Sequence, residues 1–193
     1  MIPNNRLLLL VTLAGAVLSL GQTQPQRTAT PVLNVCDVLS TPLKYNGHVI
    51  VIRGRVDGTD EGAWLLGDHC SGISTTGDYT WRSIIYLAMP TIAAPLRVHQ
   101  VNFSFDWESR RRAQLKYQKL RKSVPVACVE FTYSGLFETR EDWPRHKLVY
   151  PNGVWKYAGF GHLGEAPGQL LLKSEDDVTV LPDCTANNGE GKR

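Results

Sequence analysis

The sequence predicts a mainly β fold of five strands, with one helix between the third and fourth strands and a short helix near the N-terminus. Three observations support this. Segments rich in β-branched residues recur along the chain, Gly- and Asn-containing turns separate them, and only two stretches carry helix signals. A chain of 193 residues is long enough for one domain, and a division into two would be cramped.

Residues 1–21 are predicted to be a secretory signal peptide. Arg6 precedes an apolar run over residues 7–20, shorter than the roughly 20 residues of a membrane span, and Gly21 offers a small residue for cleavage. We therefore expect a secreted or periplasmic protein; the alternative is an uncleaved anchor. Cleavage removes one basic residue, so the net charge falls from +3 to +2, a balance that indicates no particular partner.

The mature chain begins with a polar segment. Residues 22–31 are predicted to be a flexible lead-in, residues 32–184 the single domain, and residues 185–193 a disordered tail. Asn34 is expected to cap a short helix over residues 35–39, which Pro42 stops.

The first hairpin is the clearest element. Asn46-Gly47 indicates a tight turn, and residues 49–56 form a strand. Its period of two places one set of side chains on one face, Ile50, Ile52, Gly54 and Val56, and the alternate set on the other, Val49, Val51, Arg53 and Arg55. Gly54 within this strand predicts a bulge or a sharp coil. Residues 57–62 are expected to be a turn, residues 63–66 the returning strand, and residues 67–72 the next turn.

This hairpin resembles that of a known fold. A long strand with a central glycine, followed by W-L-L-G-D-x-C-S-G at residues 64–72, resembles the first hairpin of an OB-fold barrel. The motif C-D-V at residues 36–38, ahead of Y-x-G at residues 45–47, is similar to small secreted bacterial OB-like proteins of unassigned function. The resemblance covers residues 35–87 well and the rest loosely. It implies a five-stranded OB-like Greek-key barrel and little about activity.

The remaining elements follow from alternation and capping. Residues 73–79 are expected to be a loop, residues 80–89 the third strand, and residues 124–137 the fourth. Asp106 is expected to cap a helix from Trp107 to about Lys122, with Ala113, Tyr117 and Leu120 on its apolar face. Residues 169–180 are the fifth strand, interrupted by polar residues 174–177.

Four cysteines lie in the exported part of the chain, an even number that predicts two disulfides. Three pairings are possible, and we favour Cys36 with Cys70 and Cys128 with Cys184, because each would join a residue near a barrel strand to one flanking it. Zinc is the alternative, but no C-x-x-C or H-x-x-x-H spacing is present, and we expect no cofactor or metal.

The connection over residues 138–167 is long and aromatic, which is typical of a functional loop. OB-folds commonly bind ligands with this loop and with the loop between the first two strands. The candidate ligand-binding residues are Trp143, His146, Tyr150, Trp155, Tyr157 and His162. The simpler interpretation, which we favour over ligand binding, is that these aromatics form a satellite core that closes the barrel. The segment G-F-G-H-L-G at residues 159–164 indicates a tight turn rather than a phosphate loop, because no Lys-Ser/Thr follows it.

The predicted long helix presents a basic surface. Its principal residues are Arg110, Arg111, Arg112, Lys116 and Lys119. The simplest interpretation is a solvated face, and the next is attachment to an anionic polymer or lipid surface. Nucleic acid is the least favoured partner, because export separates a protein from most of the nucleic acid of the cell.

Catalytic motifs are sparse. V-D-G-T-D at residues 56–60 resembles the acidic turn of the staphylococcal-type nucleases, but the calcium-ligand Asp expected just before Pro90 is replaced by L-A-M, and the expected Glu is Ile92. No G-x-S-x-G motif occurs. The sequence therefore favours a secreted non-catalytic binding or structural protein of the cell envelope with an unknown ligand. The alternative is an extracytoplasmic hydrolase or phosphodiesterase whose site is scattered along the chain.

Overall fold

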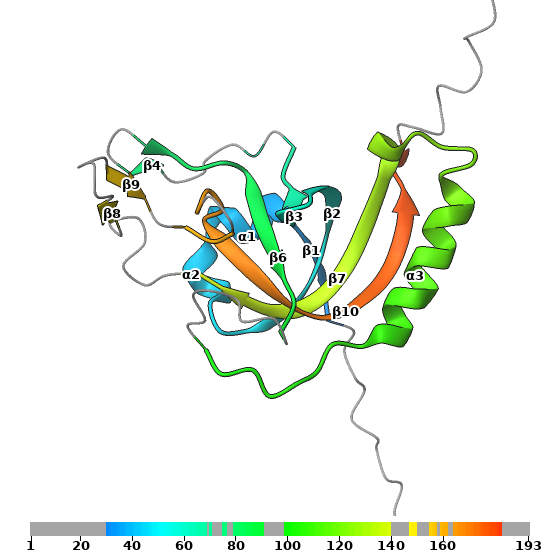
Figure 1. The fold of residues 1–193 in the computed structure, drawn as a ribbon, viewed down its shortest axis with the longest axis horizontal. Helices are drawn as coiled ribbons and strands as arrows, with labels where there is room; N and C mark the ends of the chain where they lie inside the picture. The colour runs from blue at the N-terminus through cyan, green and yellow to red at the C-terminus, as the bar shows by residue number, and fades with distance from the viewer. Residues whose placement is uncertain are drawn as a thin grey trace, which may run out of the picture.

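A six-stranded mixed sheet that closes on itself dominates the structure (Figure 1). The computed structural model describes residues 30–68, 70, 75–76, 79–90, 99–139, 147–149, 155–157, 159–161 and 164–182. The mainly β class is confirmed. The predicted signal peptide and C-terminal tail lie outside the described residues and stay predictions.

The elements run in the following order. The sheet contains β1 (Val32–Asn34), β2 (Val49–Thr59), β3 (Gly62–Leu66), β6 (Ile84–Ala88), β7 (Val129–Glu138) and β10 (Gly168–Val180). Two small hairpins pair β4 (Thr75–Thr76) with β5 (Tyr79–Thr80) and β8 (Lys147–Val149) with β9 (Trp155–Tyr157). The described helices are α1 (Val35–Ser40), α2 (Pro42–Tyr45), α3 (Trp107–Leu120) and the 3-10 turn η1 (Val126–Cys128).

Strand β2 closes the sheet into a ring because its two halves pair with different neighbours. The half from Val49 to Arg55 is antiparallel to β7, and the half from Arg55 to Thr59 is antiparallel to β3. From β3 the ring continues to β6, which runs parallel to β10, and β10 returns antiparallel to β7. Strand β1, which the sequence pattern does not indicate, lies parallel to β2 outside this ring.

Ile50 and Ile52 share one face of β2, as predicted, and of the two alternatives predicted at Gly54, the bulge is absent. Ile50 and Ile52 are buried, and the pairing with β7 passes through Gly54 without a register shift. A Cβ at Gly54 would lie 3.0 Å from Val35 Cγ2 and 3.3 Å from the carbonyl oxygen of Leu66. The glycine therefore gives α1 room to approach the strand.

The first turn is shorter than predicted. Asp57, Gly58 and Thr59 continue β2 by pairing with Trp64, Ala63 and Gly62 of β3. Only Asp60 and Glu61 remain as the turn. Main-chain pairing across the hairpin overrides the turn preference of these small and acidic residues.

Strand β10 is continuous where an interruption was predicted. Its pairing with β7 shifts register between Leu172 and Ser174 and again between Glu175 and Asp177, so the strand is bulged but not broken. Helix α3 supplies the reason. The Gln114 amide donates a hydrogen bond of 3.0 Å to Glu175, and Lys116 donates one of 2.6 Å to Asp177.

Other boundaries move by a few residues. The fourth strand begins at Val129 rather than residue 124, because residues 126–128 form a 3-10 turn after Pro125. The third begins at Ile84, and the preceding segment, predicted to be a loop, contains the hairpin of β4 and β5. Pro42 begins α2 rather than only ending α1.

Helix α3 is confirmed with its cap and its apolar face. Asp106 accepts hydrogen bonds from the backbone of Glu108 and Ser109, each 3.0 Å long. Ser109 and Ala113 are buried against the ring, and Tyr117 and Leu120 pack on the same core. None of the described helices is long and apolar enough to span a membrane.

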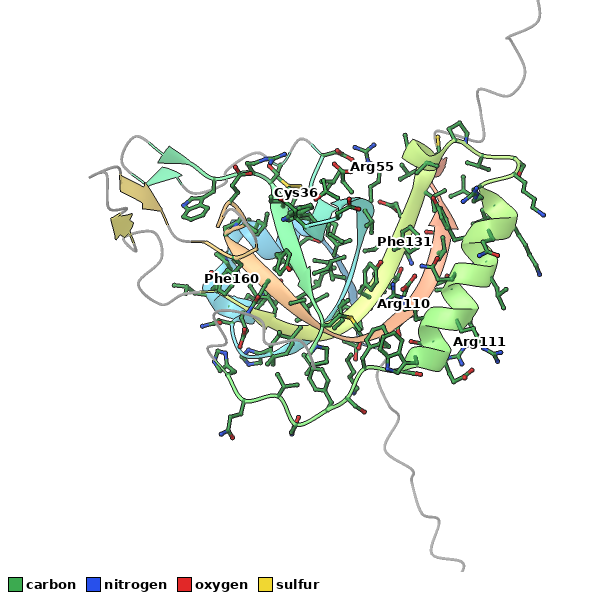
Figure 2. The ribbon with its side chains drawn as sticks, in the orientation of Figure 1. Cys36, Arg55, Arg110, Arg111, Phe131 and Phe160 are labelled. Atoms are coloured by element: carbon green, nitrogen blue, oxygen red, sulfur yellow. A yellow bond between two sulfur atoms is a disulfide. The ribbon has the colours of Figure 1, made fainter. Side chains whose placement is uncertain are left out.

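The core fills the inside of the ring and continues beneath α1. Ile52, Leu65 and Ile85 are fully buried there, and Phe131 of β7 belongs to the same cluster (Figure 2). The disulfide between Cys36 and Cys70, with Cα atoms 5.1 Å apart, ties α1 to the chain after β3 and confirms that predicted pair. Cys128 is also disulfide-bonded; its expected partner, Cys184, lies outside the described residues.

Candidate functional site

A groove of about 270 Å³ opens on the outer face of β3 and β6. Segments far apart in the chain meet there: the β2–β3 hairpin, the start of β6, and the end of the long connection before β10. The lining residues are Asp57, Thr59, Glu61, Trp64, Leu66, Arg82, Ile84, Phe160 and Glu165.

Strand alternation explains why large apolar side chains face outward here. Leu65 is fully buried inside the ring, so its neighbours Trp64 and Leu66 point to the opposite face. Trp64 lies opposite Tyr86 in the β3–β6 ladder, and their ring centroids are 6.1 Å apart. These residues, with Ile84, belong to an apolar cluster outside the ring, separate from the main core.

A tight glycine turn covers one end of this cluster. The Gly159 N–H donates to the Gly164 carbonyl over 2.8 Å, and Phe160 and Ala166 exchange backbone hydrogen bonds. Gly161 has a φ of 82°, and a Cβ there would lie 3.0 Å from the Tyr86 ring. The turn is therefore the tight one predicted, and it seats the buried Phe160 ring against the sheet.

The groove combines an aromatic surface with a net negative charge. Its lining has three carboxylates, Asp57, Glu61 and Glu165, and a single guanidinium, Arg82. Arg82 donates a 2.7 Å hydrogen bond to Glu165, which orients both groups across the groove. Asp57 accepts a hydrogen bond of 2.9 Å from the backbone of Gly58. In the described part of the chain, no group of three or more His, Cys, Asp or Glu residues could hold a metal ion.

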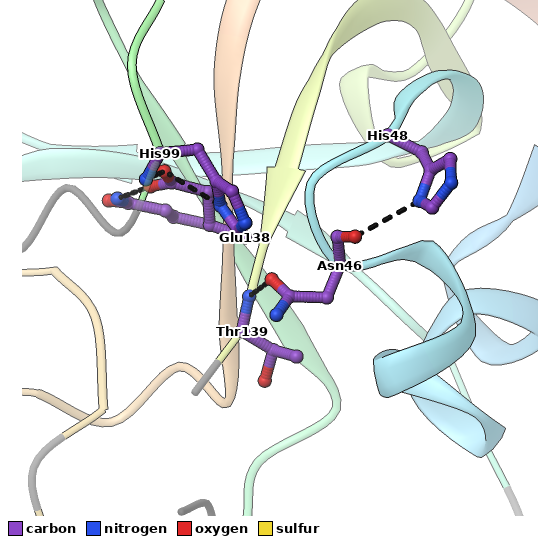
Figure 3. Close-up of polar contacts among 6 residues, drawn as sticks. Asn46, His48, His99, Glu138 and Thr139 are labelled. Carbon is purple, nitrogen blue, oxygen red and sulfur yellow. Dashed lines mark hydrogen bonds and ion pairs between the residues drawn. The ribbon is translucent and has the colours of Figure 1, made fainter. Parts of the chain in front are cut away.

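A buried polar clamp holds the base of the long connection. Glu138, fully buried, accepts hydrogen bonds from the Gln169 amide at 2.6 Å and from the backbone of His99 at 2.7 Å (Figure 3). The Thr139 hydroxyl donates to the Pro167 carbonyl at 2.9 Å. These bonds join the residues at which the connection leaves β7 and enters β10.

The clamp also reaches the turn before β2. Asn46 accepts a hydrogen bond of 2.9 Å from the Thr139 N–H, and its own carbonyl oxygen lies 3.0 Å from His48 Nδ1 (Figure 3). The Gly47 N–H donates to the Phe137 carbonyl at 2.9 Å. Both ends of the connection that carries Phe160 and Glu165 are thereby held to the ring.

The predicted ligand-binding residues fall largely outside what the structure describes. Trp143, His146, Tyr150 and His162 are not among the described residues. The backbone of Trp155 and Tyr157 lies in β9, paired with β8. The same connection supplies Phe160 and Glu165 to the groove.

Sequence reasoning did not single out Trp64 and Arg82 as site residues. The alternation of residues 63–66 could have identified Trp64. If Leu65 faces inward, the large aromatic Trp64 lies on the outer face, next to the hairpin turn. The position of Arg82 opposite Glu165 depends on the chain's return after 83 residues, which no local pattern reveals.

The basic surface of α3 is exposed, as the helical pattern requires. Arg111 pairs with Glu108 at 3.2 Å, and the Arg110 guanidinium lies 5.7 Å from the centroid of the Trp107 ring. The hydrogen bond from Lys116 lowers the pKa of Asp177. Arg112 and Lys119 are exposed and form no ion pair with another described residue.

One ionisable side chain is buried beneath the same helix. Glu175 is only 3% exposed, and removal from water raises the pKa of its carboxyl, although the hydrogen bond from Gln114 opposes this. Ser109 Oγ accepts a hydrogen bond of 3.0 Å from the Glu175 N–H. Together these contacts attach α3 to β10.

A scan against protein-family models finds no match for this sequence, and searches of the curated proteins and of the solved structures find none either.

Proposed function

We propose that this protein is an exported, non-catalytic binding protein with an OB-like barrel, and that its ligand occupies the groove over β3 and β6. The strand order β2-β3-β6-β10-β7, the parallel pair of β6 with β10, and the place of α3 between β6 and β7 support the OB-like assignment. The Cys36–Cys70 disulfide is compatible with an oxidising compartment.

The composition of the groove carries this proposal. In an OB-fold, the face of the second and third strands and the loops after the first and fourth strands bind oligonucleotides and oligosaccharides. The groove draws its lining from the corresponding places, with Trp64 on β3, Ile84 on β6, Glu61 in the first loop and Phe160 in the long connection.

The charge of the groove favours an oligosaccharide over an oligonucleotide. Three carboxylates against one guanidinium repel phosphates, whereas carboxylates accept hydrogen bonds from sugar hydroxyls. Trp64 is half-buried and lines the groove, so the exposed part of its ring is an apolar surface against which a sugar ring can pack. The ligand we propose is therefore an uncharged or cationic envelope glycan.

A glycan array followed by calorimetry tests this function. We expect the protein to retain glycans, and Trp64→Ala to weaken the binding of the best one by about tenfold, since an aromatic contact contributes about 1 kcal/mol or more. The matched control is Trp107→Ala, because Trp107 is 60% exposed on α3, away from the groove lining. Circular dichroism of both variants controls for folding. Retention of no glycan, or equal affinities for the wild type and Trp64→Ala, would overturn the proposal.

An extracytoplasmic hydrolase is the second candidate, and the three groove carboxylates favour it, because glycoside hydrolysis uses a carboxylate pair. Incubating the retained glycan with the protein and measuring its chain length by mass spectrometry separates the two functions. A binding protein returns the glycan intact. Shortening that disappears in Asp57→Asn or Glu165→Gln would identify a hydrolase instead.

A further inference from the structure

The outward face of α3 carries two large apolar side chains that stay more than half exposed, although the Trp107 ring also contacts Phe105 and Arg110. Trp107 is 60% exposed and Leu115 is 53% exposed. They are eight residues apart, which is about 12 Å along a helix, and the period of 3.6 places both on the side opposite the buried Ser109 and Ala113. Arg111, on the same side, points away from the ring in Figure 2.

Cations surround this apolar pair. Residues 107–122 contain seven basic side chains and one acid, a net charge of +6. Because the whole chain has a net charge of +3, the residues outside this segment sum to −3. Two of the seven are partly neutralised, Arg111 by Glu108 and Lys116 by Asp177. Arg112, Lys119 and Lys122 are exposed and form no ion pair with a described residue.

We propose that this outward face of α3 docks the protein on the surface of an anionic lipid bilayer. An exposed Trp suits the headgroup region, where an apolar ring and a polar N–H are both accommodated. Lys and Arg near an anionic membrane are each attracted by about 1 kcal/mol. A soluble anionic polymer would use the cations but would leave Trp107 and Leu115 in water, so the bilayer accounts for both features.

The arrangement of the molecule supports this orientation. In Figure 2, Phe160, which lines the groove, lies at the opposite end of the view from α3. A molecule docked through α3 therefore keeps the groove available to a ligand. With only two apolar side chains inserted, the attachment is reversible and depends on salt.

Vesicle sedimentation tests this inference, with the protein lacking the predicted signal peptide, residues 22–193. The vesicles contain 30 mol% phosphatidylglycerol in phosphatidylcholine, with pure phosphatidylcholine in parallel. We expect the protein to bind the anionic vesicles alone. The affinity of Trp107→Ala/Leu115→Ala should fall at least tenfold, because two apolar side chains that the bilayer would bury are removed. We expect Arg112→Gln/Lys119→Gln/Lys122→Gln to weaken binding by about 100-fold, as three attracted charges are removed.

The matched control lies on another helix. Leu43 is 55% exposed on α2, and the ammonium of its neighbour Lys44 lies 5.1 Å from the Tyr45 ring centroid. Leu43→Ala/Lys44→Gln therefore removes an exposed apolar side chain and a cation from a different helix. This control should bind as the wild type does. The proposal is overturned by no binding to anionic vesicles, by an equal loss in the control, or by unchanged binding of Trp107→Ala/Leu115→Ala. The last result would indicate that the helix binds anionic polymers instead. In that case the wild type and Trp107→Ala/Leu115→Ala would bind immobilised polyphosphate equally well.

Discussion

Gly135 lies in β7 where the backbone of β10 passes very close to it. A Cβ at this position would lie 2.5 Å from the Leu171 carbonyl oxygen and 2.9 Å from Leu170 Cγ. The backbone oxygen cannot move without disturbing the ladder between the two strands. We expect Gly135→Ala to lower the free energy of unfolding by about 1–3 kcal/mol, measured by urea denaturation.

The adjacent residue provides the control for this substitution. Ser134 is half-buried in the same strand, and Ser134→Ala should change the free energy of unfolding by no more than about 0.5 kcal/mol. Equal urea midpoints for Gly135→Ala and Ser134→Ala would contradict the close approach of the two strands at Gly135.

Glu175 should make stability fall as pH rises. Its folded-state pKa lies above the ordinary value of 4.5, so at pH values below 4.5 the group is protonated in both the folded and unfolded states. Above 4.5 the unfolded chain releases the proton first, and the folded state loses relative stability. We therefore expect the stability of Glu175→Gln, relative to the wild type, to increase between pH 4 and pH 7 in urea denaturation.

Asp177 supplies the comparison of opposite sign. Lys116 holds the folded-state pKa of Asp177 below 3.8, so its contribution to stability is present above that pH and is lost as pH falls through the folded value. The stability of Asp177→Asn, relative to the wild type, should rise as the pH falls below 4. If Glu175→Gln and Asp177→Asn show the same pH trend, the contrast between these two carboxyl groups is wrong.

Among the elements, α1 depends most on a covalent constraint. The Cys36–Cys70 disulfide spans 34 residues and joins α1 to the chain after β3. Opening a loop of that length releases entropy in the unfolded chain, so we expect Cys36→Ser/Cys70→Ser to lower the free energy of unfolding by about 4 kcal/mol. Thermal and urea unfolding of the double variant measure the loss.

The second disulfide provides an internal control for that experiment. Cys128 remains disulfide-bonded in the double variant, so adding a reductant should lower its stability further. A double variant as stable as the wild type would show that the contacts of Val35 and Leu39, both buried, hold α1 without the bridge.

Elements with a local signal were predicted well. Asn34 and Asp106 begin α1 and α3 at the expected residues, because a capping side chain needs only the backbone two or three positions away. Strand β10 was predicted to be interrupted, because its polar residues have no apparent partner within the strand. Gln114 and Lys116 of α3, 61 residues earlier, are those partners.

At the scale of the whole molecule, charge is divided between two regions. The groove over β3 and β6 has a net negative lining, and α3 carries a strong positive charge. The two proposals use these regions separately, glycan binding in the groove and lipid docking through α3. Trp64→Ala should therefore leave vesicle binding unchanged, and Trp107→Ala should leave glycan binding unchanged.

What the sequence determined by itself is local. The alternation of faces along β2 and the capped, amphipathic α3 followed from spacing and residue chemistry, because each depends on neighbours within a strand or a helical turn. The cysteine count allowed three pairings, and the Cys36–Cys70 pair that we favoured is the one that forms.

The tertiary structure alone decided where the groove lies and which residues line it. Asp57, Arg82 and Glu165 meet only because β2 changes partner at Arg55, the ring closes, and the clamp at Glu138 and Thr139 returns the long connection to β10. Tertiary packing also brings α1 close to Gly54 and buries Glu175 beneath α3. Such contacts join residues far apart in the chain, and periodicity carries information only about near neighbours.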